Sequence, residues 1–498
     1  MKRILLLLVA AAVLLAAAVL IRTVRYHSRQ AAALPATDLT LDASAAAQRF
    51  AGALRFKTIS YQDSLQFDAA EFRRFQDYLA TSFPKTHATL ARETVGRFSL
   101  LYRWTGTDTS LPPVVLMAHQ DVVPVEPGTE AKWTYPAFDG RIAEGYVWGR
   151  GAMDDKGSLV AQLEAIETLL SQGATLSRTV YLALGHDEEV GGRAGAAAIA
   201  ALLGSRGVRP AFVLDEGGAI ATGLVPGVAG PVALVGIAEK GYLTLNLTVR
   251  VDGGHSSMPP RQTAVGILSA AIEELEERPV PGGIRGPTAQ MFDYLGPELP
   301  FGMRLFFANR WLFGGLLASR FGASPAGNAM LRTTTAPTII EAGVKENVLP
   351  SVARATVNFR LLQGDSIAGI LAYVQRTIDD PRVTVSIPET FKTEPSPVSP
   401  VDAEEYRLLT HTIRQVVPEA IVVPWLVVGG TDSRYFAPLT PNVYRFGAAP
   451  IGPGDTERAH GTNERLSVEG YAQNVKFYLQ LLRNTTMGSG TERGGEGR

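Results

Sequence analysis

Three apolar stretches of the sequence each end in side chains that can bind a metal ion. The stretches are 113–118, 180–185 and 212–214, and the side chains that follow them are His119 with Asp121, Glu188 with Glu189, and Asp215. Each stretch has the length and composition of a buried strand. In a parallel sheet covered by helices, ligands bind where the carboxyl ends of the strands meet. The sequence therefore predicts that these side chains share one site.

A glycine-punctuated loop, 147–157, adds the carboxylates of Asp154 and Asp155. Imidazole and carboxylate ligands suit zinc and similar divalent ions, and one carboxylate can bridge two cations. A single strand-end histidine is weak evidence, and paired acids often only begin a solvated helix. Their joint occurrence after apolar stretches, in a chain with only 7 histidines, indicates a two-metal hydrolase.

The composition limits the classes of function. With 498 residues and 46% hydrophobic residues, the chain can form more than one domain with a sizeable core. A formal charge of -1 gives no bulk attraction to nucleic acid, so we expect a small-molecule or short-peptide substrate and no nucleic-acid partner. The chain has no cysteine, so His, Asp and Glu must hold any metal.

The N-terminus carries an uninterrupted apolar run over residues 4–21, which is just long enough to span a bilayer. We expect residues 1–30 to be a signal anchor or a signal peptide, and the protein to be exported. No small-x-small cleavage site closes the run, which favours an uncleaved anchor with the catalytic domain outside the cytoplasm. If the segment is cleaved, the protein is secreted or periplasmic.

The pattern of strands and helices predicts an α/β catalytic domain interrupted by a second domain. Strands alternate with helices from 113 to 214, as in a mostly parallel sheet. Strands of alternating polarity at 243–251 and 353–360 indicate an inserted α+β domain; its expected role as a lid or in dimerisation is implied by the family resemblance given below. The predicted ranges are 45–240 and 393–485 for the catalytic domain, 241–392 for the inserted domain, and 486–498 for a disordered tail.

The order and spacing of these motifs resemble a known family. The matching motifs include His119-x-Asp121, Asp154-Asp155-Lys-Gly, Glu188-Glu189-x-Gly, Asp215-Glu-Gly, Gly-His255-Ser, Asn347-Val-x-Pro, Asn-x-Arg360, Gly-Thr431-Asp and His460-Gly-x-Asn-Glu464. They look like the co-catalytic di-zinc peptidase family of glutamate carboxypeptidase, aminoacylase and succinyl-diaminopimelate desuccinylase. Segments 304–313 and 332–338 resemble the branch with yeast vacuolar Gly-X carboxypeptidase and the N-fatty-acyl-amino-acid synthase/hydrolase.

The resemblance implies a role for each candidate metal ligand. Two Zn²⁺ ions per subunit are expected, and Co²⁺ or Mn²⁺ would suit the same ligands. The implied ligands are Asp154 as the bridge, His119 and Asp215 on one ion, and Glu189 and His460 on the other. Many relatives carry Glu at the position of Asp215, so Glu216 competes for that role. Glu188 becomes the general base, Asp121 orients the imidazole of His119, and the peptide bond between Asp154 and Asp155 is commonly cis.

Four further residues gain a role from the resemblance. Arg360 and Asn347, in the inserted domain, and Thr431 are expected to bind substrate, with the Arg360 guanidinium gripping a carboxylate. His255 reaches the site of a partner subunit in relatives, where it stabilises an oxyanion, so a homodimer is expected. Without the resemblance, His255 reads as a turn histidine and Arg360 as a surface charge on a strand.

The sequence thus predicts a di-zinc amidohydrolase that cleaves an amide next to a free carboxylate. We expect an N-acyl, and specifically fatty-acyl, amino acid hydrolase or synthase; the alternative is a Gly-X-type metallocarboxypeptidase or dipeptidase. A two-metal phosphoesterase would not need Arg360 and Asn347, and a non-catalytic binding protein would lack Glu188. The aromatic segment 291–317 is expected to line an acyl groove or touch a membrane, unless it only packs on the inserted domain.

Overall fold

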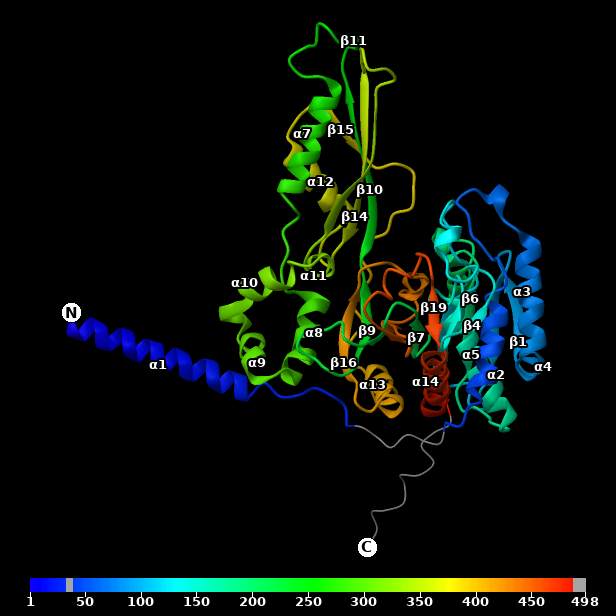
Figure 1. The fold of residues 1–498 in the computed structure, drawn as a ribbon. Coiled ribbons are helices and arrows are strands. Elements are labelled where there is room, and N and C mark those ends of the chain that lie inside the picture. The colour runs from blue at the N-terminus through cyan, green and yellow to red at the C-terminus, as the bar shows by residue number, and fades with distance from the viewer. Residues whose placement is uncertain (33–38, 487–498) are drawn as a thin grey trace.

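The computed structural model describes residues 1–32 and 39–486, and its largest element is a ten-stranded sheet (Figure 1). Nine strands follow one path, and the tenth, β16 (Ile421–Val427), pairs with β9. The path is β1 (Ala91–Val95), β2 (Ser99–Trp104), β6 (Val180–Gly185), β3 (Val114–His119), β7 (Phe212–Asp215), β17 (Val443–Arg445), β9 (Val232–Glu239), β8 (Ala219–Ala221) and β18 (Pro450–Ile451). Three strands of this path, β6, β3 and β7, are the apolar stretches from which the site was predicted.

The large sheet is mixed, which corrects the prediction of a mostly parallel sheet. The central strands β6, β3, β7 and β17 pair in parallel. Towards one edge β2 pairs antiparallel with β6 and β1 with β2, and on the other side β9 pairs antiparallel with β17 and β8. The parallel centre places the carboxyl ends of β3, β6 and β7 at one edge of the sheet, as the site requires.

Burial on both faces explains why the central strands are continuous apolar runs. Every residue of β3 and β6 is buried. Helices α2 (Ala43–Ala53), α5 (Lys156–Ser171) and α14 (Val468–Thr486) contribute to the core on one face, and α6 (Ala196–Ser205) to the core on the other. Helices α3 (Ala69–Ser82) and α13 (Glu404–Val416) also contribute buried side chains to the first of these cores, and α4 (Pro84–Thr89) packs against α5. The small sheet of β4 (Arg141–Ala143), β5 (Tyr146–Trp148) and β19 (Arg465–Ser467) contacts α2 and α14.

A four-stranded antiparallel sheet rises away from the large sheet (Figure 1). Its order is β12 (Thr334–Ala342), β14 (Val352–Leu361), β10 (Gly241–Arg250) and β15 (Val383–Ser386). Burial alternates along β10, so one face packs under α7 (Ala264–Glu277) and α12 (Ile367–Ile378) around a separate core. We call this part the upper domain. At its far end β11 (Gly254–His255) pairs with β13 (Val348–Leu349).

Most of the segment between α7 and β12 packs away from the upper sheet, although Val280 at its start joins the core of the upper domain. Helix α8 (Gly286–Leu295) and α11 (Pro325–Leu331) contribute Met291, Phe292 and Met330 to a core shared with Val423 and Leu426 of β16. Helices α9 (Phe301–Ala308) and α10 (Arg310–Phe321) lie beside the N-terminal helix (Figure 1). Part of the predicted insert 241–392 therefore belongs, by its packing, with the large sheet.

The N-terminal helix α1 (Lys2–Val24) is the one helix in the described residues that is long and apolar enough to cross a membrane. Only Val19 and Thr23 of this helix are buried. The chain that follows α1 is bound to β16, because the side-chain amide of Gln30 donates to the Val422 carbonyl at 3.0 Å and accepts from the Val422 amide at 2.8 Å. The predicted tail from 487 onwards lies outside the described residues.

Candidate metal centre

Within residues 1–32 and 39–486, two groups of side chains could each hold a metal ion, and they share Asp154. In the first, His119 Nε2 lies 2.9 Å from Asp154 Oδ1 and 3.3 Å from Glu216 Oε1. In the second, His460 Nε2 lies 2.9 Å from Asp154 Oδ2 and 3.3 Å from Glu189 Oε2. Because each oxygen of the Asp154 carboxylate faces a different imidazole, this side chain has the geometry of a bridge between two cations.

Strand ends and loops bring these residues together from distant parts of the chain. His119 is the last residue of β3, Glu189 follows β6 by four residues, and Glu216 comes directly after β7. Asp154 lies in the loop before α5, joined to Asp155 by a cis peptide bond. His460 lies in the loop between β18 and β19 with a positive φ of 60°. The predicted meeting of three strand ends is therefore present.

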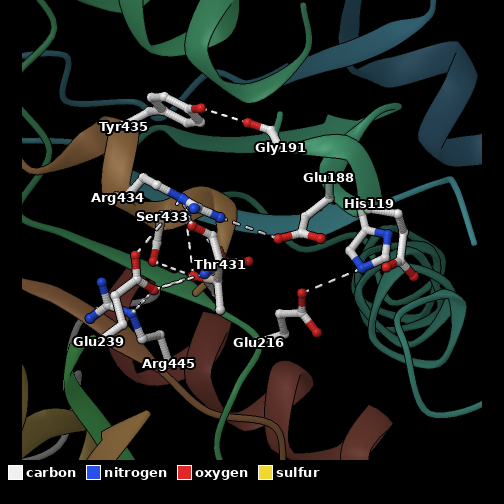
Figure 2. A network of polar contacts seen from close by, with 12 residues as sticks. His119, Glu188, Gly191, Glu216, Glu239, Thr431, Ser433, Arg434, Tyr435 and Arg445 are labelled. Atoms are coloured by element: carbon white, nitrogen blue, oxygen red, sulfur yellow. Dashed lines mark hydrogen bonds and ion pairs between the residues drawn. The ribbon is translucent and has the colours of Figure 1, made fainter. Parts of the chain in front are cut away.

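The placement of Asp215 differs from its predicted role as a metal ligand. Its Oδ2 accepts a hydrogen bond of 2.8 Å from the backbone amide of Ser433, and Asp215 is in neither candidate metal group. Glu216 faces His119 instead (Figure 2). Successive side chains along a strand point to opposite faces, so only one of two adjacent acids at the end of β7 can reach the site. We therefore propose Glu216 in place of Asp215.

Asp121 is fully buried and occupies the position predicted for it. Its Oδ1 lies 3.3 Å from His119 Nδ1, and its two oxygens accept the backbone amides of Glu188 and Glu189 at 3.2 and 3.1 Å. His119 Nδ1 also lies 3.0 Å from the carbonyl oxygen of Asp121, so this residue fixes the imidazole ring, and its carboxylate fixes the chain after β6. Carboxylates in this position orient metal-binding imidazoles and raise their basicity.

A buried ion pair joins the two loops that carry Asp154 and His460. Arg150 Nη1 donates to Glu464 Oε2 at 2.7 Å, and Arg150 Nη2 donates to the carbonyl of His460 at 3.1 Å. Glu464 Oε1 accepts the backbone amides of Met153 and Asp154 at 2.8 and 3.2 Å. Glu464, whose motif was recognised without a role, therefore positions the bridging carboxylate.

Glu188 lies beside the two groups without belonging to either. Its Oε1 is 3.5 Å from Arg434 Nη2, and Figure 2 shows its carboxylate between Arg434 and His119. Burial, followed by the nearby charge of Asp432, raises the pKa of Glu188 well above its usual range. A carboxylate with a raised pKa close to a metal centre suits a general base. Arg434 was not predicted as a site residue. The only sequence feature that pointed to it was its position four residues after Gly430, which begins the glycine-threonine-aspartate motif.

Thr431 belongs to a buried network and does not line an open surface. Its backbone amide and its hydroxyl donate to Glu239 Oε2 at 2.9 and 3.0 Å, and Arg445 Nε donates to the same oxygen at 3.1 Å. Thr431 is only 3% exposed. Its placement therefore supports a role in holding the 430–434 loop, as Figure 2 shows, rather than the predicted contact with substrate.

The other predicted substrate residues lie in the upper domain. Arg360 stacks on Tyr242 with its guanidinium 4.7 Å from the ring centre, and burial lowers its pKa. His255 and Asn347 are exposed at the far end of that domain, where Ser256 donates its backbone amide to the Asn347 carbonyl at 3.2 Å. The structure does not bring His255 or Asn347 to the two metal groups of the same chain (Figure 1).

The electrostatics of the two groups fit divalent cations. Burial raises the pKa of Glu189 to about 7 and that of Glu216 to about 8. Hydrogen bonds to Asp154 and Glu189 raise the pKa of His460 to about 10. Among the described residues, Glu189 Oε1 is buried without a hydrogen-bond partner. Buried carboxylates that resist ionisation, next to imidazoles, form a set of nitrogen and oxygen donors that a divalent ion completes.

Comparison with known proteins identifies the family. Residues 115–484 match Peptidase family M20/M25/M40. The chain belongs to this family. It is 41% identical over 481 residues to the probable carboxypeptidase S-like 2 of Dictyostelium discoideum, with 94% of this chain and 91% of that protein covered. It is 43% identical over 438 residues to the N-fatty-acyl-amino acid synthase/hydrolase PM20D1 of Xenopus tropicalis, with 87% and 84% covered.

The M20 fold is also found among solved structures. The M20 family metallo-carboxypeptidase Sso-CP2 from Sulfolobus solfataricus superposes with a TM-score of 0.64 at 18% identity, covering 90% of this chain and 99% of that one. This similarity shows the shared fold. Together with the sequence relatives, it confirms the family resemblance drawn from the motifs and identifies this M20 protein as a hydrolase.

Paired substitutions at 215 and 216 decide which acid of this M20 protein binds metal. We expect Glu216→Gln to lower metal content and affinity, because it removes a charged ligand facing His119. Asp215→Asn should retain both ions, since an amide oxygen can still accept from Ser433. Elemental analysis and zinc titration measure the difference. Loss of metal in Asp215→Asn with none in Glu216→Gln would restore the assignment made from the sequence.

Proposed function

We propose that this protein is a di-zinc amidohydrolase that cleaves an amide bond next to a free carboxylate. The observation that carries the proposal is the pair of metal-binding groups sharing Asp154, with Glu188 directly beside them. His119, Asp154 and Glu216 would hold one ion, and Asp154, Glu189 and His460 the other. Zn²⁺ suits these ligands, as would Co²⁺ or Mn²⁺.

The side chains around the metal centre have different roles in hydrolysis. Bound divalent ions would acidify a water molecule and polarise the scissile carbonyl. The Glu188 carboxylate accepts the proton of the attacking water and later delivers it to the leaving amine. Arg434, 3.5 Å away, holds the Glu188 carboxylate in place. Asp121 keeps the His119 ring oriented through Nδ1.

The proposed substrate is an N-fatty-acyl amino acid. Relatives at about 40% identity are named for synthesis and hydrolysis of such compounds, whereas others are named carboxypeptidase S. Both names describe an amide beside a free carboxylate, which Arg360 is suited to grip. A peptide carboxypeptidase is the second candidate, favoured by the similarity to carboxypeptidase S-like proteins.

A series of acyl lengths tests the proposed substrate. With N-acyl phenylalanines from acetyl to dodecanoyl, we expect kcat/KM to rise by up to about fourfold per methylene until the site is filled, because each buried methylene contributes about 0.8 kcal/mol. The rates are measured below the micelle concentration of each compound, with N-blocked dipeptides as the comparison set. A flat or falling series, with faster cleavage of dipeptides, would favour the carboxypeptidase.

Arg360 is predicted to select substrates with a free carboxylate. Arg360→Ala should lower kcat/KM by roughly 10- to 100-fold, mainly through KM, because hydrogen bonds to charged groups contribute about 1.5–3 kcal/mol. Arg360→Lys should recover little, since it cannot form a bidentate pair. The matched control is Arg354→Ala, an exposed arginine on the same strand β14. Equal rates for acid and amide substrates in the native protein would contradict this role.

The proposal includes a homodimer and attachment to a membrane. Strand β12 leaves an exposed edge on the upper sheet with Ile339 and Ile340, 52% and 64% exposed, which suits pairing with a second copy. Such a dimer would give the exposed His255 a route to the site of the partner subunit.

Helix α1 would anchor the protein, with the catalytic domain outside the cytoplasm; cleavage after α1 would release it in secreted or periplasmic form.

A further inference from the structure

Helices α9 and α10 carry an apolar surface that the proposed catalysis does not use. Its exposed side chains are Phe301, Met303, Phe306, Trp311, Leu312 and Leu316. Trp311 is 56% exposed and Leu316 is 49% exposed. Neither helix contains a fully buried apolar side chain, so these residues contribute little to the core of the protein. Contiguous apolar surface of this kind marks a site of contact with another apolar phase.

This surface is continuous with the end of α1. Asn309, which joins α9 to α10 and is fully buried, donates through Nδ2 to the carbonyl of Val19 at 3.2 Å and to the Thr23 hydroxyl at 3.1 Å. Val19 and Thr23 are the two buried residues of α1. Figure 1 shows α9 and α10 on the side of the molecule from which α1 leaves. Helix α1 and the apolar surface of α9 and α10 must therefore be in contact with the same medium.

The length of α1 sets the depth in a bilayer at which α9 and α10 lie. Its 23 residues make a helix about 35 Å long, and the apolar part of a bilayer is about 30 Å thick. When Lys2 lies at one boundary of the apolar part of the bilayer, the end of the helix, Val19 to Val24, lies at the other boundary. Helices that pack against those residues therefore lie at the level of the lipid headgroups, where amphipathic helices bury apolar side chains about 5–10 Å deep.

The charges of this segment favour lipid over a second protein copy. No acidic residue occurs between Glu298 and Glu341, whereas Arg304 and Arg320 lie on the two helices; a third arginine, Arg310, is paired with Asp293 of α8. A symmetric dimer through this face would place the same arginine-bearing patch on both partners, so like charges would oppose each other. Lipid phosphates would instead attract them.

We propose that α9 and α10 form a membrane-embedded platform, residues 301–321, that seats the protein on the bilayer beside α1. The platform extends the proposed anchor from the single helix α1 to a surface of three helices. Arg22 and Arg25, at the end of α1, lie at the same level and add to the attraction for lipid phosphates. The proposal does not depend on the reaction that the metal centre performs.

Single cysteines in the full chain test the platform cleanly, because the native sequence has none. Leu312→Cys and Leu316→Cys are spin-labelled and reconstituted in phosphatidylcholine vesicles with one fifth phosphatidylglycerol. The controls are Met258→Cys and Val344→Cys, 80% and 94% exposed in the upper domain. We expect labels at 312 and 316 to collide more with oxygen, which is enriched in the bilayer, than with a water-soluble nickel complex. The control labels should show the reverse.

Two other outcomes would overturn the platform. Labels at 312 and 316 that are as accessible to the nickel complex as those at 258 and 344 would show that this face is in water. Labels shielded from both oxygen and nickel would show that protein covers it. Circular dichroism of the same labelled chains reports folding, and their hydrolysis of a soluble acyl amino acid is measured separately. A chain with bilayer-embedded labels but no amidase activity would refute the proposed function and leave the platform intact.

Discussion

Glu188→Gln lowers kcat by about 10²-fold or more while the protein keeps its metal ions, because general-base catalysis typically contributes that much. The expectation follows from the position of Glu188 outside both metal groups and beside them. Glutamine preserves the shape of the side chain and can still accept from Arg434, but it cannot take a proton from water. Steady-state rates and elemental analysis on the same preparation measure the two effects.

The neighbouring residue provides the matched comparison. Glu189→Gln makes the same chemical change one position away, but Glu189 Oε2 faces His460 within the second metal group. This variant should lose metal as well as activity. If Glu188→Gln released the ions, or retained a near-normal kcat, the roles of the two glutamates would have to be exchanged or abandoned.

Asp154→Asn should have the largest effect on metal content, with activity lost entirely. Both groups depend on this carboxylate, which lies 2.9 Å from each imidazole. Added zinc should raise the unfolding temperature of the native protein and not that of the variant, since zinc at 1,000 times its Kd stabilises the fold by about 4 kcal/mol. The control is Glu457→Gln, an exposed acid in the His460 loop. Full activity in metal-free native protein would refute the proposed centre.

The stabilisation by zinc should shrink as the pH falls from about 10 to about 6, because His460, Glu216 and Glu189 must all lose their protons to bind zinc. Glu189 and Glu216 have pKa values of about 7 and about 8, above the value of 4.5 expected in the unfolded chain. The metal-free fold therefore holds protons that the unfolded chain has released, and it loses stability as the pH rises through that range. Zinc replaces these protons, so its binding weakens in acid. Calorimetry in buffers of different ionisation enthalpy measures the released protons.

The sequence was sufficient to predict the strand ends but not every side-chain direction. His119, Asp154, Glu189 and His460 come together as expected, because apolar runs that end in acids and histidine mark the carboxyl edge of a buried sheet. The choice between Asp215 and Glu216 depends on how the last residue of β7 is turned. A shift of one residue along a strand moves a side chain to the opposite face of the sheet. Nothing in the sequence shows whether residue 215 or residue 216 points to the metal groups.

Long-range contacts account for the other differences. The aromatic segment 291–317 was expected to line an acyl groove or touch a membrane, unless it only packed on the inserted domain. Met291 and Phe292 pack against β16 instead, while Phe301 and Trp311 face outwards beside α1. The antiparallel pairing of β2 with β6 made the sheet mixed, and strand direction is not encoded in an apolar run. Thr431 was predicted from its motif, but its hydrogen-bond partner Glu239 lies on β9, 192 positions away in the sequence.

The ion pair of Arg150 with Glu464 joins residues 314 positions apart, and this has a consequence for biosynthesis. During synthesis, chains fold from the N-terminus onward. The first imidazole and the Asp154 carboxylate emerge more than 300 positions before His460 and Glu464. A nascent chain therefore cannot complete the second metal group or secure the loop of Asp154 until Glu464 has been synthesised. Products that terminate before His460 leave the ribosome without a complete centre.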